Sequence, residues 1–405
     1  MLRNRTLGAV VTARFVSLLG SNMTLVALPW FVLATTSSTA RMGVVLACET
    51  IPAVVLGVPA GDVVARIGPR RALVLGDALR APLLAAVPVL SWLGVLSFPL
   101  LLLLVTAIGV FSVPYAAASN AILPEIVGED TSEVARATAT LQVAIQTTGV
   151  VGPILAGVLI RLAGAPSILL LDAASYGVSA AIVALFVRAG RGLARAARRR
   201  GVLVGVRQVR RDPVLASIVA AALAAHVGLA ALFATLPALA FRTFHDARTA
   251  GVLFAADAVG SVLGGLLALA LARRVQPLRL GVIGFAAMAA PIWILTAASS
   301  LPVAVAAMFL FGIGGPLGVS PISATLTTRA PAEIRPQVVS AFLAITAAGT
   351  PLGAAGAGLA IERIGFGATY VAIATTTTLA TLLLWGSVRR TRRAAPEPAP
   401  APEPA

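Results

Sequence analysis

Lysine is absent from this sequence, and charged residues of all kinds make up only 11% of it. The net charge of +16 therefore comes from arginine alone. A basic balance of this size can indicate a nucleic-acid partner, but these arginines lie between apolar runs and form no continuous basic face, so we expect none. Cys48 is the single cysteine, which excludes an intrachain disulfide and a metal site built from cysteines.

Segments typical of ATP-driven or catalytic proteins are missing as well. The run GIGGPLG at 312–318 resembles a nucleotide-binding loop, but no strand precedes it and no phosphate-binding lysine follows it. We therefore expect no enzymatic activity, no cofactor and no bound metal. Energy for any work must then come from a gradient across a membrane.

Hydrophobic residues make up 59% of the chain, and the mean hydropathy is +0.96. A soluble domain of this composition would expose large apolar patches, so the bilayer is the expected solvent. Apolar stretches follow one another at 10–34, 42–64, 72–93, 97–119, 135–160, 167–187, 214–241, 249–272, 278–298, 302–325, 337–361 and 367–388. Each can cross about 30 Å of hydrocarbon as a helix. The expected fold is an all-α membrane protein with twelve transmembrane helices.

The second half of the sequence repeats the first. At a shift of 208 residues, Glu49 coincides with Asp257, Gly57 with Gly265, Arg66 with Arg274, Pro69 with Pro277, Arg71 with Arg279 and Gly76 with Gly284. A duplicated membrane bundle is the usual plan of a carrier whose site lies between the halves. We therefore predict a six-helix bundle at 1–188, a basic linker at 189–213, a second six-helix bundle at 214–388 and a disordered tail at 389–405.

An even number of spans places both termini on one side of the membrane. Loops on that side contain the arginine-rich runs, at 66–71, 188–211, 273–279, 329–335 and 389–393, whereas the opposite loops contain only Arg41, Arg161, Arg242, Arg248 and Arg363. This asymmetry predicts a multi-pass protein of the inner (plasma) membrane with both termini cytoplasmic. Anionic headgroups of the membrane lipids are the expected partners of the linker arginines.

The segment GDVVARIGPRRALVLGD, at 61–77, resembles the signature loop between spans 2 and 3 of the major facilitator superfamily. The matching residues are Gly61, Arg66, Gly68, Arg70 and Arg71. Ala65 stands where the family has an aspartate, which in relatives faces a helix end of the other half and helps to latch the cytoplasmic side. Asp62 lies four residues before Arg66, so the two could form a weakened latch or only a local ion pair that orders the loop.

Two further stretches, 13–33 and 112–127, are similar to drug- and siderophore-exporting members of that superfamily. Within GVVGPILAG in span 5, Gly152, Pro153 and Gly157 partly match the glycine–proline motif of its antiporters, although tight helix packing explains the same small residues. The resemblance implies a monomeric carrier that works on a small-molecule substrate by alternating access. Span 4 lacks the arginine found in many proton-coupled exporters of the superfamily.

Ionisable residues inside the spans are candidates for coupling, because each costs on the order of 3 kcal/mol at mid-membrane. Glu49 and Asp257 occupy equivalent positions in spans 2 and 8 and suit proton coupling or the binding of a cationic substrate, with a neutral, hydrogen-bonded carboxyl as the alternative. His226 in span 7 is a third candidate, since histidine titrates near neutrality, or else a packing residue.

We interpret the other polar residues in the spans as structural groups or as candidates for lining the central cavity. We interpret Asp77 and Arg80 as a structural pair in span 3, and Asp172 as a helix-packing or capping group in span 6. Uncharged candidates for the central cavity are Asn22, Gln142 and Gln146, with hydrogen bonding between helices as the alternative.

The predicted function is proton-driven export of small, largely apolar compounds such as drugs, secondary metabolites or a siderophore. Uptake of a nutrient by the same fold is one alternative. A membrane receptor or scaffold without transport is another, which the departures at Ala65 and in span 4 leave open.

Overall fold

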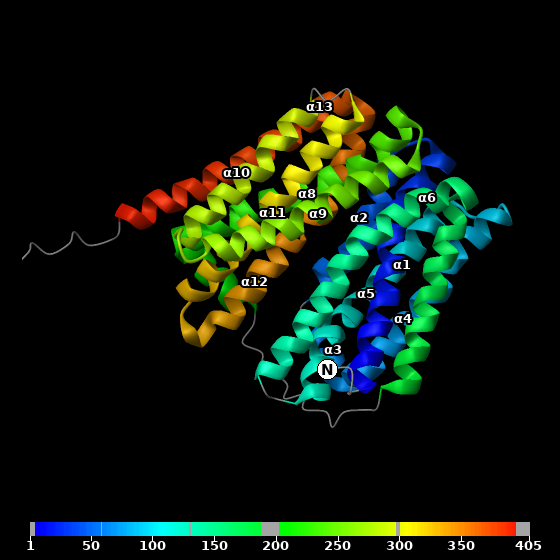
Figure 1. Cartoon of the computed structure of the whole chain (residues 1–405), viewed down its shortest axis with the longest axis horizontal. Helices are drawn as coiled ribbons and strands as arrows, with labels where there is room; N and C mark the ends of the chain where they lie inside the picture. The colour runs from blue at the N-terminus through cyan, green and yellow to red at the C-terminus, as the bar shows by residue number, and fades with distance from the viewer. Residues whose placement is uncertain (1–4, 58, 129–130, 188–201, 297–299, 394–405) are drawn as a thin grey trace, which may run out of the picture.

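The computed structural model describes residues 5–57, 59–128, 131–187, 202–296 and 300–393. The first half consists of α1 (Arg5–Thr36), α2 (Thr39–Leu56), α3 (Ala60–Ile67), α4 (Pro69–Trp92), α5 (Phe98–Val127) and α6 (Thr131–Phe186). The second consists of α7 (Val202–Arg211), α8 (Pro213–Leu239), η1 (Ala240–Phe244), α9 (Ala247–Leu271), α10 (Pro277–Thr296), α11 (Leu301–Arg329), η2 (Ala332–Ile334), α12 (Arg335–Ala347) and α13 (Gly349–Arg393). Figure 1 shows the two sets as neighbouring helical bundles.

Helix α6, and the continuous stretch formed by η2, α12 and α13, are each long enough for two membrane spans. The break in α6 is at Gly164, with φ 79°, and the break in α13 is at Gly365, with φ 80°, a backbone region that favours glycine because it lacks a Cβ. In the described part of the chain, ten helical stretches are long and apolar enough to cross a membrane, and two of them cover 51 and 58 residues. Two crossings in each of these long stretches agree with the predicted twelve, and the all-α fold is confirmed.

Two boundaries differ in detail from the sequence-based prediction. Helix α13 continues to Arg393, past the predicted end of the last span at 388. The predicted linker contains α7, in which Gly205 packs against the backbone of Gln337 in α12. The rest of the linker, 188–201, and the tail from 394 onwards lie outside the described residues.

One hydrophobic core cluster runs through both bundles, and two pairs of helices make the largest contacts between them. Helix α1 packs on α6, and α4 packs on α5 and α6; in the second bundle α8 packs on α13, and α11 packs on α9 and α10. Across the bundles, α6 packs on α9 and α2 packs on α13. We call the end of the molecule where α1 begins the near face, and the end where α1 gives way to α2 the far face.

The bundles are hydrogen-bonded to one another at the far face. One carboxylate oxygen of Glu362 accepts hydrogen bonds from the Ser38 hydroxyl at 2.7 Å and from the backbone N–H of Ala40 at 2.9 Å. The Arg242 guanidinium donates to the backbone carbonyl of Ser37 at 3.0 Å. A carboxylate of the second bundle therefore caps the amino end of α2 in the first, where the helix leaves backbone N–H groups unpaired.

Glycines bring the backbones of the two bundles into close contact just below these hydrogen bonds. A Cβ built on Gly43 of α2 would lie 2.6 Å from the carbonyl oxygen of Ala354 in α13, and one on Gly251 of α9 would lie 3.0 Å from the carbonyl carbon of Pro153 in α6. Gly43 and Gly251 are separated by the 208-residue shift of the internal repeat. The two halves therefore form two equivalent close helix crossings, α2 on α13 and α9 on α6.

The antiporter-like residues of α6 lie at these close contacts. A Cβ on Gly157 would lie 2.8 Å from the Cα of Arg248, and one on Gly152 would lie 2.6 Å from the Cβ of Asn22. With the Pro153 carbonyl against Gly251, the motif joins α6 to both α1 and α9. Its link to antiport stays a prediction.

The amino end of α8, at the near face, is capped by Asp212. One carboxylate oxygen accepts the backbone N–H groups of Val214 at 2.9 Å and Leu215 at 3.3 Å, and the other accepts Nε–H of Arg329 at 2.8 Å. Partial burial acts to raise the pKa of Asp212, but the hydrogen bonds from Arg329, Val214 and Leu215 outweigh it and hold the pKa below its ordinary value of 3.8.

Replacing Asp212→Ala is expected to lower the free energy of unfolding by about 1 kcal/mol at neutral pH, because two N–H groups lose their acceptor. A lowered pKa in the folded state adds stability above the unfolded pKa, and that stability is lost as the pH falls through the folded value. Thermal unfolding of the two proteins in detergent should therefore differ at pH 7 and converge at about pH 3. A difference that persists unchanged at acid pH would contradict this assignment.

Candidate functional site

A cavity of about 870 Å³ lies between the two bundles, bounded by α6 and α9 with Pro316 of α11. Gln142 and Gln146 line one side and Ser261 lines the other. Thr147 adds a hydroxyl, and Gly265 also lines the cavity. The other lining residues are apolar: Ala139, Val143, Val150, Val151, Val262, Leu266 and Leu269.

The position of this cavity along the helices shows which end of the molecule is closed. Its lining in α6 comes before Gly157, and its lining in α9 comes after Gly251. The cavity therefore lies between the glycine contacts and the near face. The bundles meet at the far face and separate below it.

The two carboxyls that occupy equivalent sequence positions have different surroundings. Glu49 lines a second cavity, of about 530 Å³, between α2 and α5, together with the hydroxyls of Thr50 and Ser112. Asp257 lies in α9 four residues before Ser261, hence on the same side of the helix as a residue that lines the cavity between the bundles. A coupling role for either residue stays a prediction.

Asn22 and His226 are engaged in contacts between or within helices. The Asn22 amide donates to the backbone carbonyl of Leu18 at 2.9 Å and to the Thr148 hydroxyl of α6 at 3.2 Å. The Nδ1 atom of His226 lies 2.8 Å from the Ala222 carbonyl oxygen. Neither residue lines the two cavities described above, and their proposed roles stay predictions.

The loop that resembles the family signature is formed by α3 and the start of α4. Asp62 lies in the first turn of α3 and Arg66 in the last, and Gly68, with φ 84°, joins α3 to α4. Arg70 donates to the backbone carbonyls of Val187 and Ala184, at the end of α6. Gly61 has open space around its Cα and Arg71 is exposed. Arg70 thus anchors the last turn of α6, and the latch through Asp62 and Arg66 stays a prediction.

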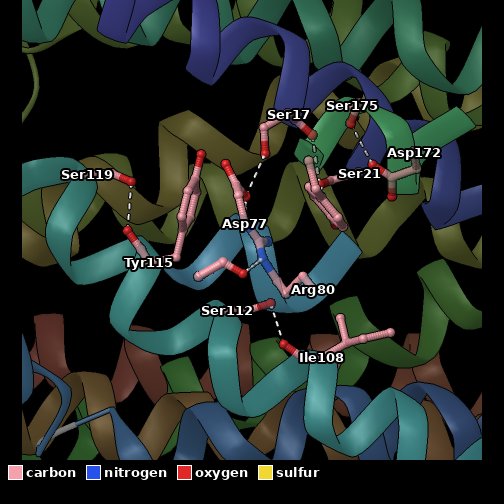
Figure 2. Close-up of polar contacts among 12 residues, drawn as sticks. Ser17, Ser21, Asp77, Arg80, Ile108, Ser112, Tyr115, Ser119, Asp172 and Ser175 are labelled. Atoms are coloured by element: carbon pink, nitrogen blue, oxygen red, sulfur yellow. Dashed lines mark hydrogen bonds and ion pairs between the residues drawn. The ribbon is translucent and has the colours of Figure 1, made fainter. Parts of the chain in front are cut away.

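A cluster of polar side chains is buried among α1, α4, α5 and α6, and Figure 2 shows its members pointing toward one another. At its centre Arg80 forms an ion pair with Asp77. The guanidinium lies between the rings of Tyr115 and Tyr176, 4.2 Å from each centroid. Asp77 is 0% and Arg80 5% exposed. The predicted pairing of Asp77 with Arg80 is confirmed.

Asp172 lies in the same buried cluster. Its two carboxylate oxygens accept hydrogen bonds from Thr24 of α1 at 2.6 Å and from Ser175 at 3.0 Å. Gly20 of α1 allows this approach, because a methyl group there would overlap both Asp172 and Ser175. Asp172 is 0% exposed and interacts electrostatically with Arg80 and with Glu49.

Sequence reasoning assigned Asp77 and Arg80 to one element and Asp172 to another, and missed that they form one cluster. The available signal was the composition of the facing helix, since Ser17, Ser21 and Thr24 follow at spacings of four and three residues and so share one side of α1. Such a stripe of hydroxyls on a membrane helix indicates a polar neighbour.

The model of the Major Facilitator Superfamily matches residues 10–245 and 220–405. The chain belongs to the Major Facilitator Superfamily. It is therefore a multi-pass membrane transporter, and members of this superfamily bind small-molecule substrates and typically function as monomers. The resemblance inferred from the loop at 61–77 is confirmed.

Curated relatives of similar length include multidrug efflux pumps. The chain is 25% identical over 394 residues to "Multidrug efflux pump Tap" of Mycobacterium tuberculosis, covering 92% of each protein. It is 26% identical over 368 residues to the protein of the same name from Mycolicibacterium fortuitum, covering 87% of this chain and 88% of the other.

Solved transporters share the fold at low sequence identity. The nucleoside transporter NupG matches with a TM-score of 0.77 and 14% identity, covering 95% of this chain and 99% of the other. A bacterial homologue of the lysosomal transporter Spinster, in an inward-facing and unoccupied conformation, matches with a TM-score of 0.76 and 15% identity, covering 97% and 98%. These likenesses show the fold alone.

Proposed function

We propose that this transporter exports small, largely apolar compounds, such as drugs, secondary metabolites or a siderophore, by proton antiport. The observation that carries the proposal is the cavity of about 870 Å³ between the bundles, whose walls are apolar and whose polar groups are uncharged amides and hydroxyls. Such a lining suits a substrate that is mostly apolar with a few hydrogen-bonding groups. Similarity over nearly the whole chain to multidrug efflux pumps supports the direction of transport.

The closed far face supports transport by alternating access. The excess of arginine in the near-face loops makes that face the cytoplasmic one under the positive-inside rule. A cavity that lies on the cytoplasmic side of the far-face contacts is placed to receive substrate from inside the cell. Export then requires the far-face contacts to open while the near face closes.

The energy for export would come from protons moving inward. At about 150 mV, one proton supplies about 3.5 kcal/mol, which is enough for roughly 300-fold accumulation of a neutral substrate. Glu49 lines one cavity, and Asp257 lies one helical turn from Ser261, which lines the other. These two carboxyls are the proposed participants in coupling.

The direct test is accumulation of ethidium in an efflux-deficient bacterial host that expresses the transporter. Cells with the protein should accumulate less ethidium than control cells, and an uncoupler should abolish the difference. The double variant Glu49→Gln, Asp257→Asn should lose the uncoupler-sensitive difference, because no proton can bind at either position.

The variant Glu333→Gln, which changes an exposed carboxylate in η2, is the matched control and should behave as wild type. Higher accumulation in expressing cells would indicate import. Full export by the double variant would exclude Glu49 and Asp257 as participants.

A further inference from the structure

We propose that Asp172 holds the transported proton, and that Glu49 connects it to the water of the cavity between α2 and α5. The inference rests on the proposed function of proton antiport. It assigns the proton to the buried cluster of the first bundle, away from the cavity that would hold the substrate.

The first argument is the balance of charge around Asp172. Arg80 is the cation that interacts with Asp172, and its guanidinium is already paired with Asp77. Arg14 of α1 also lies over the Tyr115 ring, 4.9 Å from its centroid. Arg14 is ten residues, or about 15 Å of helix, from the Thr24 that contacts Asp172. Among the described residues no cation is therefore in direct contact with Asp172, and a buried carboxyl without such a contact binds a proton more readily than one that has it.

The second argument compares the contacts that stabilise the charged form of Asp77 with those of Asp172. Asp77 is in direct ionic contact with Arg80 and accepts a further hydrogen bond from Ser17 at 3.4 Å. Asp172 has no direct ionic contact, and its partners are the hydroxyls of Thr24 and Ser175. A hydroxyl can donate to a carboxylate and can equally accept from a carboxylic acid. Asp172 can therefore gain or lose a proton without leaving a hydrogen-bonding group unpaired.

The third argument is a route to water. The titratable and charged groups that face Asp172 are Glu49 of α2, Asp77 and Arg80 of α4, and Tyr176 of α6, whose hydroxyl is hydrogen-bonded to Ser21 at 2.9 Å. Glu49 interacts electrostatically with Asp172 and Tyr176 and also lines the 530 Å³ cavity. It is thus the one group among these that joins the buried cluster to a space large enough for water.

The fourth argument is that the second bundle folds without such a cluster. Under the 208-residue shift, Asp77 corresponds to Phe285 and Arg80 to Met288; under the 201-residue shift that relates Gly164 to Gly365, Asp172 corresponds to Ile373. All three of these counterparts are buried apolar side chains. Packing alone does not require charges at these positions, so the first bundle retains them for another purpose.

In the proposed cycle a hydronium ion in the cavity gives its proton to the Glu49 carboxylate. Glu49 passes the proton to a carboxylate oxygen of Asp172, so that one O–H bond forms as another breaks and Glu49 is charged again. Release of the proton on the opposite side restores the Asp172 carboxylate, which then shares Arg80 with Asp77. The net charge of the cluster therefore rises by one when Asp172 binds the proton and falls by one when the proton leaves. This alternation is what couples proton movement to movement of the helices.

The test compares wild type, Asp172→Asn and the control Glu333→Gln after reconstitution. Infrared difference spectra between about pH 5 and pH 9 should show a protonated carboxyl band that titrates in wild type and in the control, and this band should lose intensity in Asp172→Asn. In proteoliposomes with ethidium as the probe, Asp172→Asn should lose accumulation driven by a pH gradient. It should retain ethidium counterflow within about twofold of wild type, since exchange needs no net proton movement.

The asparagine side chain keeps both hydrogen-bonding positions, so the variant is expected to fold, and Asp172→Glu should restore part of the gradient-driven transport. Gradient-driven accumulation by Asp172→Asn at the wild-type level, or a titrating band of unchanged intensity in that variant, would overturn the assignment. Wild-type protein that ignores the pH gradient altogether would instead reject proton antiport itself, a result distinct from the failure of Asp172→Asn alone.

Discussion

Replacing Arg80→Met is expected to lower the free energy of unfolding by about 3–5 kcal/mol, the largest stability loss that we predict for a single side chain. The substitution removes the ionic partner of Asp77, whose carboxylate is 0% exposed and has no other cation in contact with it among the described residues. It also removes the guanidinium from between Tyr115 and Tyr176. A loss of this size is a large part of the total free energy of unfolding of an ordinary protein.

The native cysteine provides the measurement. Cys48 is half-buried and is the only thiol, so a thiol-reactive fluorescent dye reports thermal unfolding in detergent. The matched control is Arg329→Met, because Arg329 also pairs with an aspartate, at 2.8 Å, but its side chain is 40% exposed. That change should cost no more than about 1 kcal/mol.

A second substitution separates the charge from the packing. Arg80→Met combined with Asp77→Asn should recover much of the lost stability, since no isolated charge then remains in the membrane. Met288, the counterpart of Arg80 in the second bundle, is buried at 5% exposure, which shows that methionine packs well at this level. Equal instability of the single and double variants would mean that the stacking on the two tyrosines, and not the ion pair, is what Arg80 supplies.

The sequence was sufficient for the fold because hydrophobic length and duplication do not depend on helix orientation. Runs of about 20 apolar residues must cross the membrane whatever their neighbours, and the 208-residue shift predicts that contacts of one half recur in the other. Gly43 and Gly251 show this directly, since they lie at two equivalent crossings between the bundles, α2 on α13 and α9 on α6.

The cluster around Asp172 could not be predicted in the same way. In a membrane protein both the lipid-facing and the buried sides of a helix are apolar, so periodicity does not tell one from the other; Leu103 is 66% exposed and its neighbour Leu104 is 9% exposed. The rotation of α6 about its axis, which turns Asp172 toward α1 and α4, is set by contacts such as the one at Gly20. Duplication does not predict the cluster either, since Glu49 interacts electrostatically with Asp172 whereas its counterpart Asp257 lies in α9 of the other bundle.

Replacing both Gly43→Val and Gly251→Val is expected to shift the resting conformation toward one that is open at the far face. Each added side chain would collide with the backbone of the other bundle, where a Cβ alone comes within 2.6 Å of Ala354 or 3.0 Å of Pro153. Overpacking of this kind costs about 1–3 kcal/mol per site. Only the conformation that is closed at the far face is destabilised. Each substitution should therefore change the ratio of the open to the closed conformation by about 5- to 150-fold.

Spin labels report this change directly. With Cys48→Ser as background, labels at Leu93→Cys and Ser300→Cys lie on exposed far-face positions of opposite bundles. The distance between the labels should lengthen in the double glycine variant, and the two single variants should give intermediate populations because the crossings are separate contacts. Gly177→Val is the matched control, since its added side chain meets nothing within 4 Å.

The same variants connect the far-face contacts to transport. If closure at Gly43 and Gly251 is what keeps the cavity open toward the near face only, a molecule held open at the far face binds substrate from the opposite side. Ethidium export should then fall in the double variant although Asp172, Glu49 and the cavity lining are intact. Unchanged label distances together with wild-type export would show that the far face closes through Glu362 and Arg242 without help from the glycine contacts.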